Sequence, residues 1–345
     1  MKIKSVGLSA AAFSAQVVLS CVLAMTATAP AALAQGKTDQ APKISAGEQK
    51  LAEAINAAKD PAAKLKAAIA FIKKYPQSTL RPNVAGVAAD QIADVTDATQ
   101  KTNMALEYQA AFNQPAEQDL IMPTLIDGYA GANRIDEAFG KGAEYVTAHP
   151  DSLRVLVRLM GLGTEQAKQN NPKFVEQSLK YGAHAIELIE AKKIPAGMND
   201  VTWKYYESIL PALYQSMGVL NLVKGDSAEA RTRLTKASEL APADPLNYLF
   251  LADIYISEYT DIAKRYQAMP NNQAKNDEYV KVLASLDKAI DILARVVALS
   301  EGNAPLAKAR QQSLQDLEVY YKYRHNNSTE GMQQLIDKYK VPAKP

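Results

Sequence analysis

The sequence predicts an all-α fold made of consecutive helical hairpins, and the stretch 211–242 shows the reasons most clearly. Apolar and small residues recur at helical spacing in each half of this stretch, so each half is expected to be an amphipathic helix. Between the halves, Gly225 can take the left-handed conformation that ends a helix, and Asp226 or Ser227 can cap the next one. These features together predict two helices joined by a short turn.

Small residues within this stretch stand where two crossing helices approach each other. Gly218, Ala230 and Ala237 leave room for a neighbouring helix, and Pro242 stops the second helix. The spacing of the glycine, the paired alanines and the terminal proline resembles the tetratricopeptide repeat. That resemblance implies a right-handed α-α superhelix, or solenoid, of stacked hairpins.

Two other stretches resemble the same repeat. They span 119–150 and 245–300, and the second contains an insertion at 257–279. An insertion in a repeat array is expected to form a loop or an extended helix pair on one face. The residues at the repeat's packing positions in these two stretches are Tyr129, Ala138, Pro150, Tyr248, Ala252, Tyr255 and Ala289.

Less regular hairpins are predicted in the rest of the chain. They span 51–75, 81–115, 152–192 and 304–339. The last of them is rich in polar residues, which suits a repeat that caps the end of an array. An aromatic helical segment at 201–210 runs into Pro211, which either starts a new helix or kinks a longer one.

The N-terminal segment 1–34 has the order of a secretory signal peptide. Two early lysines precede an apolar run, and the small residues at 32–34 form a cleavage site. We expect cleavage after Ala34 and a periplasmic or secreted protein. A disordered lead-in is then predicted at 35–46, and the helical repeat domain at 47–342.

Cys21 offers an alternative to soluble export. The three residues before it distantly resemble a lipobox, which would make the protein a lipoprotein. The apolar run continues past Cys21 to Met25, and this favours cleavage after Ala34 instead. Because Cys21 is the single cysteine of the chain, cleavage leaves no thiol for disulfides, thiolate catalysis or metal binding.

The charge balance argues against a nucleic-acid partner. The chain has 39 basic and 37 acidic residues, and segment 1–34 contains two lysines and no acid, so the remainder is neutral. Binding to phosphates requires a clustered cationic surface, which neither this balance nor any run of residues supplies. After cleavage, no apolar segment long enough to span a membrane is expected.

The sequence carries no recognisable catalytic or metal-binding motif. His184 and Glu187 lie one helical turn apart, but two ligands without a third usually mark a solvated helix face. Motifs of serine hydrolases, zinc proteases and calcium loops are not found. We therefore predict a protein that is not an enzyme, with no metal and no cofactor.

The resemblance to the tetratricopeptide repeat also implies where a partner would bind. In that family, the ligand-facing side chains come from the first helix of each hairpin. On the better matched repeats these positions are Asp127, Gln215, Val219, Leu249, Asp253 and Ile256. Asp127 and Asp253 fall at equivalent places, which implies a repeated acidic acceptor for a basic group or for peptide amides.

The leading functional hypothesis is an exported, non-enzymatic scaffold that binds a peptide or protein partner, in cell-envelope assembly or as an adaptor. One alternative is a helical-array enzyme acting on envelope polymers or peptides. Another is a small-ligand-binding protein that uses the tyrosine-rich C-terminal half, since twelve of the seventeen tyrosines follow residue 200. The sequence leaves the partner's identity and the oligomeric state open.

Overall fold

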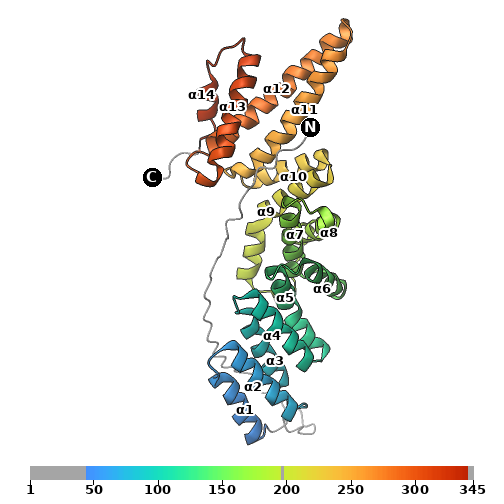
Figure 1. Ribbon diagram of the computed structural model, residues 1–345, viewed down its shortest axis with the longest axis vertical. Helices are drawn as coiled ribbons and strands as arrows, with labels where there is room; N and C mark the ends of the chain where they lie inside the picture. The colour runs from blue at the N-terminus through green and yellow to red at the C-terminus, as the bar shows by residue number, and fades with distance from the viewer. Residues whose placement is uncertain (1–43, 196–197, 341–345) are drawn as a thin grey trace, which may run out of the picture. The chain divides into compact units, whose positions relative to one another are not determined.

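The structure is a computed structural model that describes residues 44–195 and 198–340. Over these ranges the regular secondary structure is helical and contains no β-strand (Figure 1). The prediction of an all-α fold is confirmed. The α-helices are α1 (Ala46–Ala57), α2 (Pro61–Lys74), α3 (Arg81–Ala93), α4 (Ala98–Ala111), α5 (Pro115–Gly131), α6 (Ile135–Ala148), α7 (Leu153–Lys168), α8 (Val175–Glu190), α9 (Asp200–Lys224), α10 (Ser227–Leu240), α11 (Pro245–Ala268), α12 (Gln273–Leu299), α13 (Ala307–Arg324) and α14 (Met332–Asp337).

The helices pack mainly against their neighbours in sequence. Consecutive helices contact each other within hairpins such as α7 with α8, α9 with α10 and α11 with α12. Helices two apart, such as α3 with α5 and α5 with α7, are also in contact. The fold is therefore built from neighbouring helix pairs, and residues distant in the chain contribute little to any one core layer.

The hairpin turns use residues with left-handed backbone conformations. Gly225 has φ 89°, and Asn133, which follows the C-cap of α5, lies in the same region with φ 58°. In each case the next amide donates back across the helix end: Arg134 N to Tyr129 O at 2.8 Å, and Asp226 N to Asn221 O at 2.9 Å. These bonds satisfy carbonyls that the helix end would otherwise leave free.

Small residues allow the close crossing of α9 and α10. Ala230 and Ala237 are fully buried, and a Cβ atom added to Gly218 would lie 2.5 Å from Leu234 Cγ. A larger residue at these positions would force the two helices apart.

The other repeat positions fall into two groups. Tyr129, Ala138, Tyr248, Ala252 and Ala289 are buried, and Tyr255 is half-buried. Pro150 and Pro242 follow the ends of α6 and α10, where they are exposed.

The structure decides two questions that the sequence left open, one about Pro211 and one about the insertion at 257–279. Helix α9 continues through Pro211, so this proline lies inside one long helix and does not begin a new one. The insertion at 257–279 is an extension of α11 and α12, with the turn at 269–272. The insertion is thus an extended helix pair and not a loop.

The beginning of the domain differs slightly from the prediction. Helix α1 starts at Ala46, within the stretch 35–46 that was predicted to be disordered. The Ser45 side chain accepts from Glu48 N at 3.2 Å, and Glu48 Oε2 accepts from Ser45 N at 2.8 Å, forming a capping box. The predicted signal peptide, Cys21, most of the lead-in and residues 341–342 lie outside the described residues.

Two hydrophobic clusters form the interior, and α10 contributes to both. The first includes residues from Ile55 to Ala237, and the second includes residues from Ala230 to Ile336. The second cluster joins α10 to the last four helices and supports the candidate site described next. Among the helices described, none combines the length and apolar character needed to cross a bilayer.

Candidate functional site

One face of α11 carries three of the residues that the sequence placed at a binding surface. Leu249, Asp253 and Ile256 follow one another at helical spacing, and Tyr259 continues the same face. Asp253 is exposed, whereas the other three are half-buried. The neighbouring helices therefore leave this face of α11 partly open to solvent.

Helix α13 meets the same region of α11 through tyrosine side chains. The rings of Tyr259 and Tyr320 lie edge to face, with centroids 5.5 Å apart. In such a pair the two ring planes are nearly perpendicular, so the faces of the two rings point in different directions. Asp316 precedes Tyr320 by one helical turn, and Tyr323, a residue that is 60% exposed, follows it.

We call this region the α11–α13 surface. It consists of Leu249, Asp253, Ile256, Tyr259, Asp316 and Tyr320.

The two carboxylates of the α11–α13 surface are close enough to influence each other. Although Asp253 is exposed, the protein atoms around its carboxyl group remove part of its hydration, which raises the pKa of Asp253, and the charge of Asp316 raises it further. Within residues 44–195 and 198–340, neither carboxylate has a lysine, arginine or histidine nitrogen within 4.0 Å. Asp316 accepts one hydrogen bond, from Gln312 Nε2 at 3.0 Å. In the part of the chain that the structure describes, both carboxylates of this surface are therefore without an ion-pair partner.

The phenols of the same surface remain neutral at physiological pH. Burial raises the pKa of Tyr259 and of Tyr320, and nearby tyrosines or Asp316 add to that effect. Neutral rings beside two carboxylates suit a cation, because ring faces and carboxylates both attract positive charge.

Asp127 has a different environment from Asp253, although the sequence placed the two at equivalent positions. Arg154 Nη2 lies 2.7 Å from Asp127 Oδ2, and Arg158 Nε lies 3.1 Å from Oδ1. Both arginines belong to α7, the first helix of the next hairpin. The pattern within 119–150 does not specify these partners, so the sequence could not distinguish a paired carboxylate from an unpaired one.

Gln215 and Val219 do not form an open surface together with the α11 residues. Gln215 Nε2 donates to Asp244 Oδ2 at 3.1 Å and to Asn247 Oδ1 at 2.7 Å, which ties α9 to the start of α11. Val219 is 7% exposed. For Val219 the expectation of a ligand-facing side chain needs correction, because the helix packing already covers it.

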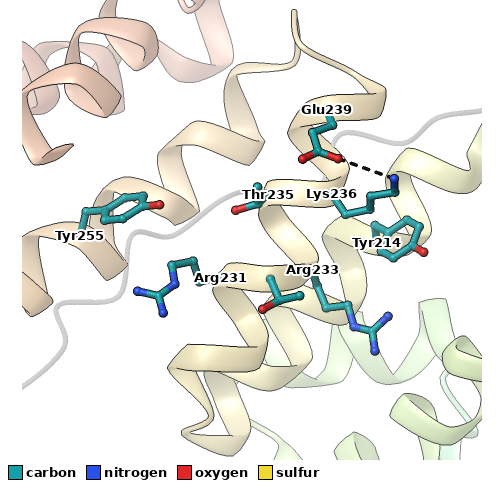
Figure 2. Close-up of a pocket in the computed structure, with 8 residues that line it drawn as sticks. Tyr214, Arg231, Arg233, Thr235, Lys236, Glu239 and Tyr255 are labelled. Atoms are coloured by element: carbon teal, nitrogen blue, oxygen red, sulfur yellow. Dashed lines mark ion pairs between the residues drawn. The ribbon is translucent and has the colours of Figure 1, made fainter.

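A separate open groove of ≈ 530 Å³ lies along α10 (Figure 2). Three cations line it, and each has a carboxylate partner. Arg233 Nε lies 2.6 Å from Glu229 Oε1, Lys236 Nζ lies 3.6 Å from Glu239 Oε2, and Arg231 pairs with Glu258. Only Glu239 of these carboxylates lines the groove itself, but all three cations are already paired, so none of them is left without a partner for an anionic ligand.

The histidine considered as a metal ligand lies within hydrogen-bond distance of two carboxylates. His184 Nε2 lies 3.0 Å from Asp151 Oδ1, and Lys193 Nζ lies 2.8 Å from the other oxygen of Asp151. Glu187 Oε2 is 3.5 Å from His184 Nδ1. In the part of the chain that the structure describes, no three His, Cys, Asp or Glu side chains are grouped to hold a metal ion.

Asp316 and Tyr259 were not singled out for the site from the sequence. A signal for Asp316 exists, because Asp316, Tyr320 and Tyr323 follow the helical spacing of one face. That pattern shows a shared face on α13 but does not indicate that α11 lies beside it.

No protein-family model matches the chain, and no curated protein matches it.

Proposed function

We propose that this protein is an exported, non-enzymatic scaffold of tetratricopeptide type that binds a peptide or protein partner. The observation that supports the proposal most strongly is the α11–α13 surface. Its aromatic and apolar side chains come from two hairpins, and its two carboxylates have no cationic partner among the described residues. Aromatic side chains are enriched at protein binding surfaces, and charges left unpaired there can be matched by complementary charges of a partner.

The repeat architecture supports the same proposal. Hairpins with left-handed turns and small residues at the crossing of α9 and α10 are features that tetratricopeptide repeats share. We propose that the hairpins continue as a right-handed superhelix. Such an array presents the first helices of successive hairpins side by side, and α11 and α13 are first helices in this assignment.

The proposed setting is the cell envelope, in assembly or as an adaptor. It depends on the predicted signal peptide at 1–34 and on the absence of cysteine from the rest of the sequence. An exported scaffold without disulfides would rely on packing for stability, and the two continuous hydrophobic clusters are consistent with that.

Affinity capture from the native envelope tests the proposal. The mature chain, a variant with Ile256→Lys on the α11–α13 surface and a control with Val280→Lys on α12 are immobilised in parallel. Val280 is 65% exposed, so the control adds the same charge outside the surface. Circular dichroism first verifies that all three are folded.

We expect a polypeptide that the wild-type and Val280→Lys proteins retain and that Ile256→Lys loses. Retention of the same polypeptides by all three proteins would contradict binding at this surface. If no polypeptide is retained by the wild-type protein, the scaffold proposal itself fails.

A further inference from the structure

We infer that the α11–α13 surface binds a lysine or arginine side chain of the partner polypeptide, with the cation held between the aromatic rings and the carboxylates of Asp253 and Asp316. This inference rests on the proposed scaffold function and specifies the chemistry of the partner. Its evidence is the combination of aromatic geometry, unpaired charge and an apolar extension along α11.

Two tyrosine rings form the aromatic part of the α11–α13 surface. Because the rings of Tyr259 and Tyr320 are inclined at 76°, the edge of one ring meets the face of the other, and the two ring planes are not stacked on each other. Tyrosine faces attract ammonium and guanidinium groups that approach within about 6 Å of the ring centre. Both tyrosines are half-buried, which reduces the screening of such a contact by water.

The charges favour a cation over any other group. Two carboxylates near each other repel, and the raised pKa of Asp253 is the consequence of this repulsion and of burial. A bound cation would offset that repulsion. Within the described residues, no ion pair of Asp253 or Asp316 would compete with it. The contrast with Asp127 is informative, because there two arginines of α7 already occupy the carboxylate.

The length of the surface favours a side chain on a polypeptide over a free amine. Leu249 and Tyr259 are ten residues apart on α11, which corresponds to roughly 15 Å along the helix axis. An extended peptide covers that distance with about four to five residues. Leu249 and Ile256 would then contact apolar residues that flank the basic side chain, and this contact is not available to a small amine.

Labelled peptides that differ at one position test the inference. Seven-residue peptides with leucine on both sides of a central lysine, arginine, norleucine or glutamate are titrated with the mature protein, and fluorescence anisotropy reports binding. Norleucine keeps the apolar stem of lysine but lacks the charge. The free diamine 1,4-diaminobutane is tested separately as a competitor.

We expect the lysine and arginine peptides to bind at least ~10-fold more tightly than the norleucine peptide. The double variant Asp253→Asn/Asp316→Asn should reduce this preference to less than about 2-fold. Tyr259→Leu should weaken the lysine peptide by about 3- to 10-fold, since it keeps apolar bulk but removes the ring. Asp277→Asn removes an exposed carboxylate on α12 and should leave the preference unchanged.

The melting temperature provides a second measurement on the double variant. The raised pKa of Asp253 means that its ionised form is disfavoured in the folded chain. Replacing both carboxylates should therefore leave the melting temperature at neutral pH unchanged or higher. A loss of peptide binding that accompanies a higher melting temperature cannot result from unfolding.

The inference is overturned if lysine is not preferred to norleucine, including the case in which none of the peptides binds. It is also overturned if the double variant keeps the preference. Equal competition by 1,4-diaminobutane and by the lysine peptide would contradict the assignment to a polypeptide and indicate a small amine ligand. Capture of a partner that depends on Ile256, without any preference for lysine, would leave the scaffold proposal standing and reject only this inference.

Discussion

A buried ion pair between Arg81 and Glu117 joins two helices in the N-terminal half. Arg81 Nε donates to Glu117 Oε1 at 2.6 Å, and Arg81 Nη2 donates to Oε2 at 2.9 Å, so the pair is bidentate. Both residues are buried. Burial alone would raise the pKa of Glu117, but hydrogen bonds from Arg81 and from the Gln114 amide, together with the charge of Arg81, lower it below 4.5. The pair therefore links α3 to α5 through charge-assisted hydrogen bonds.

Glu117→Gln should lower the free energy of unfolding at pH 7 by about 3 kcal/mol, because it leaves the Arg81 charge buried without a counter-charge. Since the folded-state pKa of Glu117 is lowered, the stability that its ionisation contributes is present above pH 4.5 and is lost as the pH falls through the folded-state pKa. The difference in the free energy of unfolding between the wild type and Glu117→Gln should thus become smaller in acid. Denaturant titrations at several pH values measure it, with Glu107→Gln, an exposed site on α4, as the control. A difference independent of pH would contradict this assignment.

Ala230→Phe tests the close crossing of α9 and α10. Ala230 is fully buried, so the larger ring should overpack the crossing and lower the free energy of unfolding by about 1 to 3 kcal/mol. Ala228→Phe, at an exposed position two residues earlier on the same helix, serves as the matched control. Equal melting temperatures for Ala230→Phe and the wild type would show that the crossing is not tightly packed.

At the scale of single elements, the ends of the helices were largely predictable. Gly225 and Asp226 marked the turn between α9 and α10, and the observed cap has Asp226 Oδ1 accepting from Glu229 N at 3.0 Å. Turn chemistry is local, so a few residues determine it. The continuation of α9 through Pro211 was not decided by the sequence, since packing against α7, α8 and α10 holds this helix.

The same substitution should have opposite effects at two glycines. Gly225→Ala should destabilise the fold by about 1 kcal/mol, because alanine is strained in the left-handed conformation that Gly225 adopts. Gly86→Ala lies inside α3, where an added Cβ meets no atom within 4 Å, and should stabilise the fold by up to about 1 kcal/mol. Thermal unfolding of both variants measures these changes. Stabilisation by Gly225→Ala would contradict the assigned helix end.

For the molecule as a whole, the sequence predicted the helical class but only part of the candidate site. Apolar periodicity located the hairpins, since each helix buries a face against near neighbours in sequence. Apolar periodicity could not predict which charged residues lie beside Asp127 and Asp253. It depends on Arg154 of α7 and on Asp316 of α13, which lie in the following hairpins.

Export predicts a defined mature N-terminus. Intact-mass and peptide mass spectrometry of the protein purified from its native source should find Gln35 as the first residue, because the small residues at 32–34 form the expected cleavage site. A chain that begins at a diacylated Cys21 would contradict soluble export and establish a lipoprotein. Retention of the segment 1–34 would contradict both.

Site-specific photocrosslinking in the native cell tests the central claim most directly. A photoreactive residue replaces Ile256 on the α11–α13 surface or, as the control, Val201 on α9, which is 75% exposed. If the protein is a scaffold that binds through this surface, irradiation should produce a discrete polypeptide adduct from position 256 and none from position 201. The adduct at 256 should disappear in the Asp253→Asn/Asp316→Asn background. No adduct at position 256, or the same adduct from both positions, would contradict the claim.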